Sequence, residues 1–170
     1  MVYKIRQYVP RKVIIMIYNA LIGSKFRYGV RAWGSSSCHL RNSLQTAQNK
    51  LLRAILFLSF TSNVHHVFSE LKLLKVENIY EHEISKLFHS VVHNYCPSAF
   101  LDFFEHAPHG YATRLRQNCC FSLSKPKTEF GKKSLKFSGV KIWTKVPLSI
   151  KEIPDSKQYN KVSKTFFLSS

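Results

Sequence analysis

The sequence predicts a mainly α-helical protein, with a helical N-terminal lobe over residues 1–108 and a smaller α+β lobe over residues 109–170 that contains a short hairpin or small sheet. Three observations support this prediction. Apolar residues recur at three- and four-residue steps before residue 105. A stretch with Pro108 and Gly110 then interrupts the helical pattern. Short strand-like runs, 119–123 and 134–137, appear only after that stretch.

The first two helices are predicted from their start and stop signals. Pro10 suits a first helical turn, and the apolar run 13–22 predicts a buried helix that ends at Gly23. Serines 35–37 offer an N-cap for the next helix, whose apolar stripe consists of Leu40, Leu44, Ala47, Leu51, Ile55 and Leu58. Its polar arc consists of Arg41, Gln45, Gln48, Asn49, Lys50 and Arg53. That arc fits a nucleic-acid backbone and a solvated face equally well.

Five more helices are predicted, over residues 64–74, 77–94, 98–104, 139–146 and a terminal segment capped by Asp155 or Ser156. Three histidines, His82, His89 and His93, share one face of the helix at 77–94. A metal pair at His89 and His93 lacks a third ligand, so a solvated polar face is the preferred interpretation. The four cysteines have no zinc-site spacing, and no metal site is predicted.

Charge is the strongest functional signal in the sequence. The chain has 170 residues, 26 Lys and Arg, 9 Asp and Glu, and a formal charge of +17. Residues 1–69 contain ten basic residues and no acid, and residues 111–170 contain thirteen basic residues against three acids. Two basic blocks therefore flank a mildly acidic middle. A polyanion is the natural partner, because neutralised phosphates release condensed counterions.

Several classes of function are disfavoured. Only Asp102 and Asp155 are aspartates, so a cluster that holds Mg²⁺ is not expected. The sequence contains no glycine-rich phosphate loop and no Gly-x-Ser-x-Gly motif. No apolar run reaches the ~18 residues of a membrane span. We therefore expect no cofactor, no small-molecule substrate and no membrane partner, and an intracellular protein.

Seven short motifs, in order, resemble the segment C-terminal to the catalytic palm of LINE-type (non-LTR) retrotransposon reverse transcriptases of the Jockey-like group. They are Tyr8-Val9-Pro10, Tyr28-Gly29-x-x-x-Trp33-Gly34, Leu44-Gln45-x-x-Gln48-Asn49-Lys50-x-x-Arg53, Glu70-Leu71-Lys72-x-Leu74, Tyr111-x-Thr113-Arg114, Phe130-Gly131-Lys132-Lys133-Ser134 and Gly139-x-Lys141-x-Trp143-x-x-x-Pro147. Arg31 and Val146 depart from the family pattern. The likeness covers about nine tenths of the chain.

This resemblance implies the thumb and post-thumb region of an RNA-directed DNA polymerase, truncated before the palm. The family holds its metal ions on palm aspartates that include a Tyr-x-Asp-Asp turn, which is absent here, so Mg²⁺ belongs to the palm and no polymerase activity is expected from this chain alone. The implied function is non-catalytic binding of RNA and DNA, as template-primer or target, in the nucleus or cytoplasm.

The residues expected to contact phosphates are the basic side chains of both blocks: Arg6, Arg11, Lys12, Arg27, Arg31, Arg41, Lys50, Arg53, Arg114, Arg116, Lys125, Lys127, Lys132, Lys133, Lys136 and Lys141. Tyr28 and Tyr111 are the candidates for base stacking, whereas Trp33 and Trp143 are expected in the core. Two alternatives remain open. One is a basic RNA-binding structural protein of a ribonucleoprotein, of organellar ribosomal type and therefore mitochondrial; the other is the product of a decayed element without function.

Overall fold

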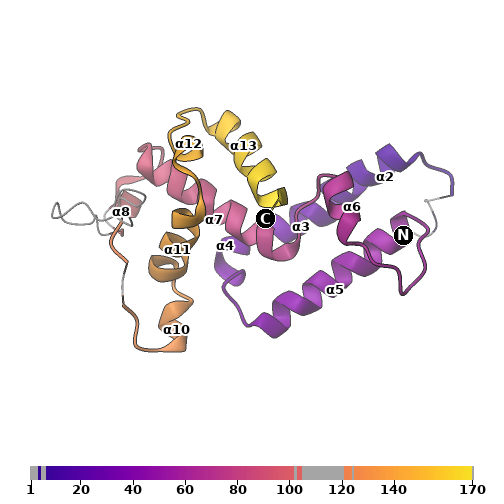
Figure 1. Ribbon diagram of the computed structural model, residues 1–170, viewed down its shortest axis with the longest axis horizontal. Coiled ribbons are helices and arrows are strands. Elements are labelled where there is room, and N and C mark those ends of the chain that lie inside the picture. Colours follow the sequence, from indigo (N-terminus) through magenta and orange to yellow (C-terminus); the bar gives the residue numbers. More distant parts are fainter. Residues whose placement is uncertain (1–3, 5–6, 102, 105–120, 124, 170) are drawn as a thin grey trace. The chain divides into compact units, whose positions relative to one another are not determined.

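The structure is a computed structural model that describes residues 4, 7–101, 103–104, 121–123 and 125–169 (Figure 1). All of its regular elements in these ranges are helical: α2 (Arg11–Ile17), η1 (Tyr18–Gly23), α3 (Ser24–Arg27), α4 (Val30–Trp33), α5 (Cys38–Ile55), α6 (His65–Glu70), α7 (Val76–Val92), α8 (Ser98–Leu101), α10 (Glu129–Lys132), η2 (Leu135–Gly139), α11 (Val140–Lys145), α12 (Leu148–Lys151) and α13 (Ser156–Ser169). The mainly α-helical fold class is confirmed.

The predicted hairpin or small sheet is wrong for the described part of the C-terminal region. Residues 134–137 alternate between polar and apolar, as a strand does, but they enter the π-helical turn η2. The Ser138 hydroxyl donates to the carbonyl of Ser134 at 2.9 Å. At the other end of the turn, a Cβ on Gly139 would lie 2.5 Å from Phe88 Cε2, so the turn packs closely on a buried ring. Four alternating residues are too few to separate a strand from a helical turn.

The chain divides into two compact units, which are described separately. Unit 1 comprises residues 1–80 and 168–170, and unit 2 comprises residues 81–167. The division falls inside helix α7. The predicted lobe boundary near residue 108 lies outside the described residues and stays a prediction.

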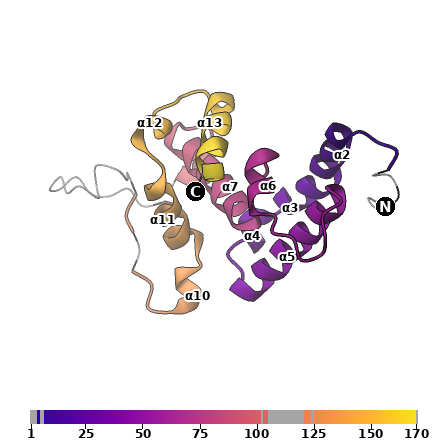
Figure 2. The same cartoon turned by 45° about the vertical axis from the view of Figure 1, so that its right-hand side comes forward.

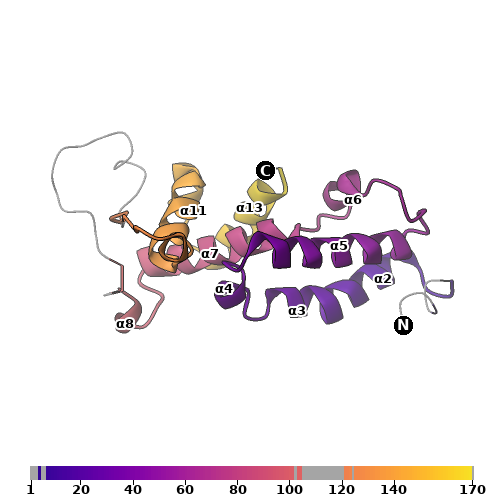
Figure 3. The same cartoon turned by 90° about the horizontal axis from the view of Figure 1, so that it is seen from below.

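In unit 1, the helical run from α2 through η1 to α3 lies beside α5, which returns in the opposite direction (Figures 1 and 3). The buried core between them and α6 consists of Ile14, Tyr18, Leu52, Ile55, Val64, Val67, Phe68 and Leu73. The first helix was predicted to be buried, but it is buried on one side only: Met16 on its outer side is 63% exposed. It also continues past Gly23 to Arg27, since Gly23 keeps helical backbone angles.

Helix α5 is confirmed, but its polar arc is not uniformly solvated. Gln48 has no exposed surface, and its Nε2 donates to the Tyr18 hydroxyl and to the carbonyl of Leu74, both at 2.9 Å. Burial raises the pKa of Tyr18, and its hydrogen bond with Gln48 lowers it by less. Leu40, from the predicted apolar stripe, is 56% exposed. The face of α5 that packs against the core therefore includes the amide of Gln48 and does not include Leu40, the first residue of the predicted apolar stripe.

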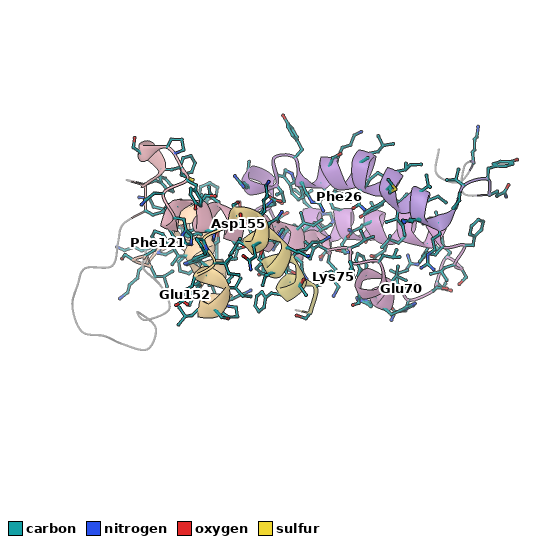
Figure 4. All side chains as sticks on the ribbon, turned by 90° about the horizontal axis from the view of Figure 1, so that it is seen from above. Phe26, Glu70, Lys75, Phe121, Glu152 and Asp155 are labelled. Carbon is teal, nitrogen blue, oxygen red and sulfur yellow. The ribbon has the colours of Figure 1, made fainter. Side chains whose placement is uncertain are left out.

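In unit 2, helices α11, α12 and α13 pack around α7 (Figure 2). Phe88 of α7 is fully buried among aromatic rings, with centroid distances of 4.7 Å to Phe104, 5.3 Å to Phe121 and 6.1 Å to Trp143. The predicted cap is confirmed at Asp155, which lies where α13 begins (Figure 4). Its carboxylate accepts from the backbone N–H groups of residues 157 and 158 at 3.0 and 3.2 Å. The five later helices are all present, with α6 and α8 shorter than predicted.

His82 and His89 of α7, and His93 directly after it, do not form a solvated face, so that interpretation is wrong. His82 and His89 are 4% and 1% exposed. The Nε2 atoms of His89 and His93 lie 2.7 Å from the carbonyl oxygen of Ile153 and 3.1 Å from that of Lys151. His82 Nε2 lies 3.4 Å from the carbonyl oxygen of Asn160 in α13. The three histidines therefore face backbone carbonyls inside unit 2 and not solvent.

Burial lowers the pKa of His89 below its ordinary value of 6.5, and the neighbouring His93 lowers it further, whereas the Ile153 carbonyl and Asp155 raise it. The neutral form is therefore favoured in the folded state. The contribution of neutral His89 to the free energy of unfolding is complete above pH 6.5, and it is lost as the pH falls from 6.5 through the folded-state pKa. We expect the urea concentration at the unfolding midpoint to decrease as the pH is lowered below 6.5. The decrease should be smaller in His89→Gln, because glutamine keeps a hydrogen-bond donor but does not titrate. An equal decline in both proteins would contradict this prediction.

Candidate nucleic-acid interface

The predicted phosphate-binding side chains differ in whether they already contact other groups of the protein. Arg6, Arg114, Arg116 and Tyr111 lie outside the described residues. The other residues divide into those that bind partners within the protein and those that are exposed with no such partner. Only side chains of the second kind are ready to bind a polyanion without first breaking a contact.

Three predicted arginines of unit 1 have internal partners. Arg11 donates to the carboxylate of Glu70 at 2.9 Å. Arg41 Nη1 lies 3.8 Å from Glu77 Oε1. Arg53 Nε donates to the carbonyl of Ser62 at 2.9 Å. The first of these is a half-exposed surface pair, which contributes at most ~1 kcal/mol and is weakened by salt.

The remaining basic side chains of unit 1 are exposed. Lys12 and Arg27 lie on the α2–α3 run, Arg31 on α4 and Lys50 on α5. The Lys50 ammonium is 6.0 Å from the centroid of the Phe60 ring, at the limit of a cation–π contact. Lys12, Arg27 and Lys50 make no ion pair in the described part of unit 1. Of the predicted phosphate contacts in this unit, these three side chains are exposed and form no ion pair.

Tyr28 is well placed for stacking. Its side chain is 85% exposed at the turn between α3 and α4. Gly29 permits that turn, because its φ of 62° lies in the left-handed region. The indole N–H of Trp33 donates to the Tyr28 carbonyl at 3.0 Å and holds the turn in place. Trp33 itself is half-buried, whereas Trp143 is 2% exposed and its core prediction is confirmed.

The predicted lysines of unit 2 gather around α10, η2 and α11. Lys125, Lys127, Lys133 and Lys141 are exposed. Lys132 pairs with Glu129 at 2.5 Å, and this hydrogen bond lowers the pKa of the Glu129 carboxyl. Lys136 is half-buried, with its ammonium 4.9 Å from the Phe103 ring centroid. The Thr128 hydroxyl accepts from the N–H of Gly131 at 3.1 Å and fixes the start of α10.

A cavity of about 160 Å³ in unit 1 was not predicted from the sequence. It lies where α5 meets the starts of α6 and α7, and Lys75, labelled in Figure 4, is one of its lining residues. The lining consists of Cys38, Arg41, Asn42, Gln45, Asn49, His65, Lys75, Val76 and Glu77. The four residues of α5 at 38, 42, 45 and 49 recur at helical spacing, which is the one signal in the sequence that pointed to a shared polar face.

Gln45 organises this cavity. Its Oε1 accepts from the backbone N–H of Val76 at 2.9 Å, and so satisfies one of the free donors at the start of α7. Its Nε2 donates to Asn49 Oδ1 at 2.9 Å. Asn42 Nδ2 lies 3.5 Å from the Cys38 sulfur. These contacts occupy one polar atom of each asparagine and leave the other facing no protein partner in the described ranges.

No known family model matches this chain, and neither the curated proteins nor the solved structures yielded a match. Within the described helices, none is both long and apolar enough to cross a membrane. The described residues also contain no group of three or more His, Cys, Asp or Glu side chains arranged to hold a metal ion.

Proposed function

We propose that this chain binds nucleic acid without catalysis, as the region C-terminal to the palm does in LINE-type reverse transcriptases. The observation that carries the proposal is the set of exposed basic side chains without an internal ion pair in each unit: Lys12, Arg27 and Lys50 in unit 1, and Lys125, Lys127, Lys133 and Lys141 in unit 2. Each can neutralise a phosphate without first breaking an ion pair.

The family part of the proposal rests on the ordered motifs, and the structure gives several motif residues a physical role. Gly29 forms the left-handed turn before α4, and Trp33 binds that turn through its indole N–H. Gly139 and Trp143 pack against Phe88 in the core of unit 2. Tyr28 supplies the exposed ring for a base. RNA and DNA are both proposed as partners, with phosphate contacts as the common chemistry.

Salt-dependent binding tests this function. For about six to ten phosphate contacts, the affinity for RNA or duplex DNA is expected to fall by three to five decades between about 50 and 200 mM salt. Lys127→Glu with Lys133→Glu should weaken binding to all sequences alike and reduce the log–log slope by about 2, since ~0.9 counterion is released per phosphate contact. Fluorescence anisotropy at several salt concentrations measures both quantities.

The matched control changes the net charge by the same amount on another helix of unit 2. Lys157 and Lys161 are exposed on α13 and are not predicted contacts. Lys157→Glu with Lys161→Glu should therefore lower affinity much less. Equal losses in the two double variants would show that net charge alone matters and would refute the assigned surface. A flat salt dependence of the unmodified protein would refute the function itself.

A further inference from the structure

Helix α5 ends in a turn that holds an aromatic residue in an unfavourable backbone conformation. The N–H of Leu58 donates to the carbonyl of Arg53 at 3.0 Å, so the chain leaves the helix at Phe57. Phe57 has a φ of 55°, in the left-handed region, where glycine and asparagine are the usual residues of such a turn. A bulky side chain is strained in this region, because its Cβ lies too close to the backbone.

Two other helix ends show what this turn requires by itself. After α6 and α7, the N–H groups of Leu73 and Tyr95 donate to the carbonyls of residues 68 and 90, at 2.9 and 2.8 Å. The left-handed residues there are Lys72 and Asn94, which are hydrophilic and exposed. The side chain of Phe57 is 57% exposed although it is apolar. Position 57 therefore carries a ring that the turn does not require and the core only partly covers.

A second exposed ring follows on the same loop. Phe60 is 74% exposed, and the Lys50 ammonium lies 6.0 Å from its ring centroid. The hydroxyls of Ser59 and Ser62 are hydrogen-bonded at 2.7 Å, and Arg53 Nε donates to the Ser62 carbonyl at 2.9 Å. These bonds brace the loop, so both rings are held on a preformed support.

The surroundings of the two rings favour an anionic ligand that also has flat faces. Residues 1–69 contain no Asp or Glu, and Lys50 is exposed without an ion pair in the described part of unit 1. Between the rings, Leu58 packs against the core and Ser59 is exposed, which interrupts the apolar surface that a lipid bilayer or a protein partner would cover. Aromatic rings beside cations are the combination with which proteins hold single-stranded nucleic acid.

We infer that Phe57 and Phe60 stack against unpaired bases of a single-stranded nucleic acid while Lys50 binds an adjoining phosphate. This inference rests on the proposed function, and it adds a preference for single strands that phosphate contacts alone do not provide. Within a duplex, the faces of each base are covered by the neighbouring bases. The backbone strain at Phe57 fits a residue that serves binding at the expense of the fold.

A double variant, Phe57→Gly with Phe60→Ala, separates binding from folding. Glycine relieves the left-handed strain, and Phe60 is mostly exposed, so the urea concentration at the unfolding midpoint should not decrease. The matched control is Asn94→Gly with Phe100→Ala, which changes a left-handed residue and an exposed phenylalanine away from the predicted contacts. A lower midpoint in the first variant alone would show that the rings serve the fold and would overturn the inference.

Binding is measured by fluorescence anisotropy with a labelled oligouridylate. The first variant should bind about tenfold more weakly, or ~1.4 kcal/mol, as expected for the loss of a base–aromatic stack. Its affinity for a blunt duplex and its salt slope should stay unchanged, because neither ring is charged. The control variant should match the unmodified protein. Vesicles of phosphatidylserine and phosphatidylcholine provide the other anionic surface, and the first variant should not change binding to them.

A photo-crosslink on the unmodified protein gives a second readout that does not depend on a variant folding. Iodouridine, placed in the same strand, reacts on irradiation with aromatic side chains against which it stacks. Peptide mass spectrometry should locate crosslinks at Phe57 or Phe60, and these crosslinks should disappear when the modified base is paired in a duplex.

The outcomes separate the inference from the function on which it rests. Equal losses for single strand and duplex, a loss of vesicle binding alone, or crosslinks at neither ring would overturn the stacking site and leave salt-dependent nucleic-acid binding intact. Absence of any salt-dependent binding by the unmodified protein would overturn both.

Discussion

Gly34→Ala is expected to destabilise unit 1 by about 3 kcal/mol, at the upper end of the usual cost of overpacking. A Cβ at this position would overlap the ring of Tyr80 at Cδ2 and would lie 2.5 Å from the carbonyl oxygen of Val30. Tyr80 is itself buried, and the Val30 carbonyl belongs to the backbone of α4, so neither neighbour can move aside cheaply. Urea unfolding followed by circular dichroism measures the loss.

Gly23→Ala is the matched control, because the chain makes the same chemical change at a position with room for it. A Cβ on Gly23 would meet nothing closer than 3.5 Å, and the residue has helical backbone angles. We expect a gain of about 0.5–1 kcal/mol from the lower entropy of the unfolded chain. Equal effects of the two substitutions would contradict the close packing of Gly34 on Tyr80.

Trp143→Ala is expected to have the largest effect of any single substitution in unit 2, about 3–5 kcal/mol. Its side chain is 2% exposed, stacks on Phe88 at 6.1 Å and lies under the Lys151 ammonium, which is 5.2 Å from its ring centroid. The substitution leaves a cavity beside the buried rings of Phe88 and Tyr159. Because a domain is typically stable by only ~5–15 kcal/mol, unit 2 should unfold at much lower urea concentrations.

Phe130→Ala is the control for this loss. Phe130 is an aromatic residue of the same unit, but it is 87% exposed, so its removal should change the unfolding free energy by less than about 0.5 kcal/mol. If Trp143→Ala cost no more than Phe130→Ala, Trp143 would not be a core residue. The tryptophan would then become a further candidate for base stacking.

Periodicity and end signals were sufficient to predict where most helices lie. The three- and four-residue steps of α5 and the Asp155 cap of α13 depend on residues close together in the sequence, and both are confirmed. The strand predicted at 134–137 was wrong because its decisive contact, Gly139 against Phe88, joins residues far apart in the sequence. The candidate cavity was missed for the same reason, since α5 supplies only part of its lining.

The burial of two polar residues was also not predicted from local sequence patterns. Gln48 and His89 read as solvated in the sequence, because amides and imidazoles usually remain in contact with water. Each has a side-chain nitrogen that pairs with oxygen atoms distant in the sequence: the Tyr18 hydroxyl and the Leu74 carbonyl for Gln48, and the Ile153 carbonyl for His89. These bonds offset part of the cost of burying a polar side chain, although the Oε1 atom of Gln48 has no hydrogen-bond partner.

The sequence by itself determined the helical class, most helix positions and the division of charge into two basic blocks, because composition and local spacing are properties of the chain before it folds. Only the tertiary structure decided which basic side chains bind partners inside the protein, which polar residues of α5 and α7 are buried, and where Arg41, Asn42, Asn49 and Lys75 enclose a cavity. These outcomes depend on hydrogen bonds and packing between segments distant in the sequence, and no local pattern records which segments will meet.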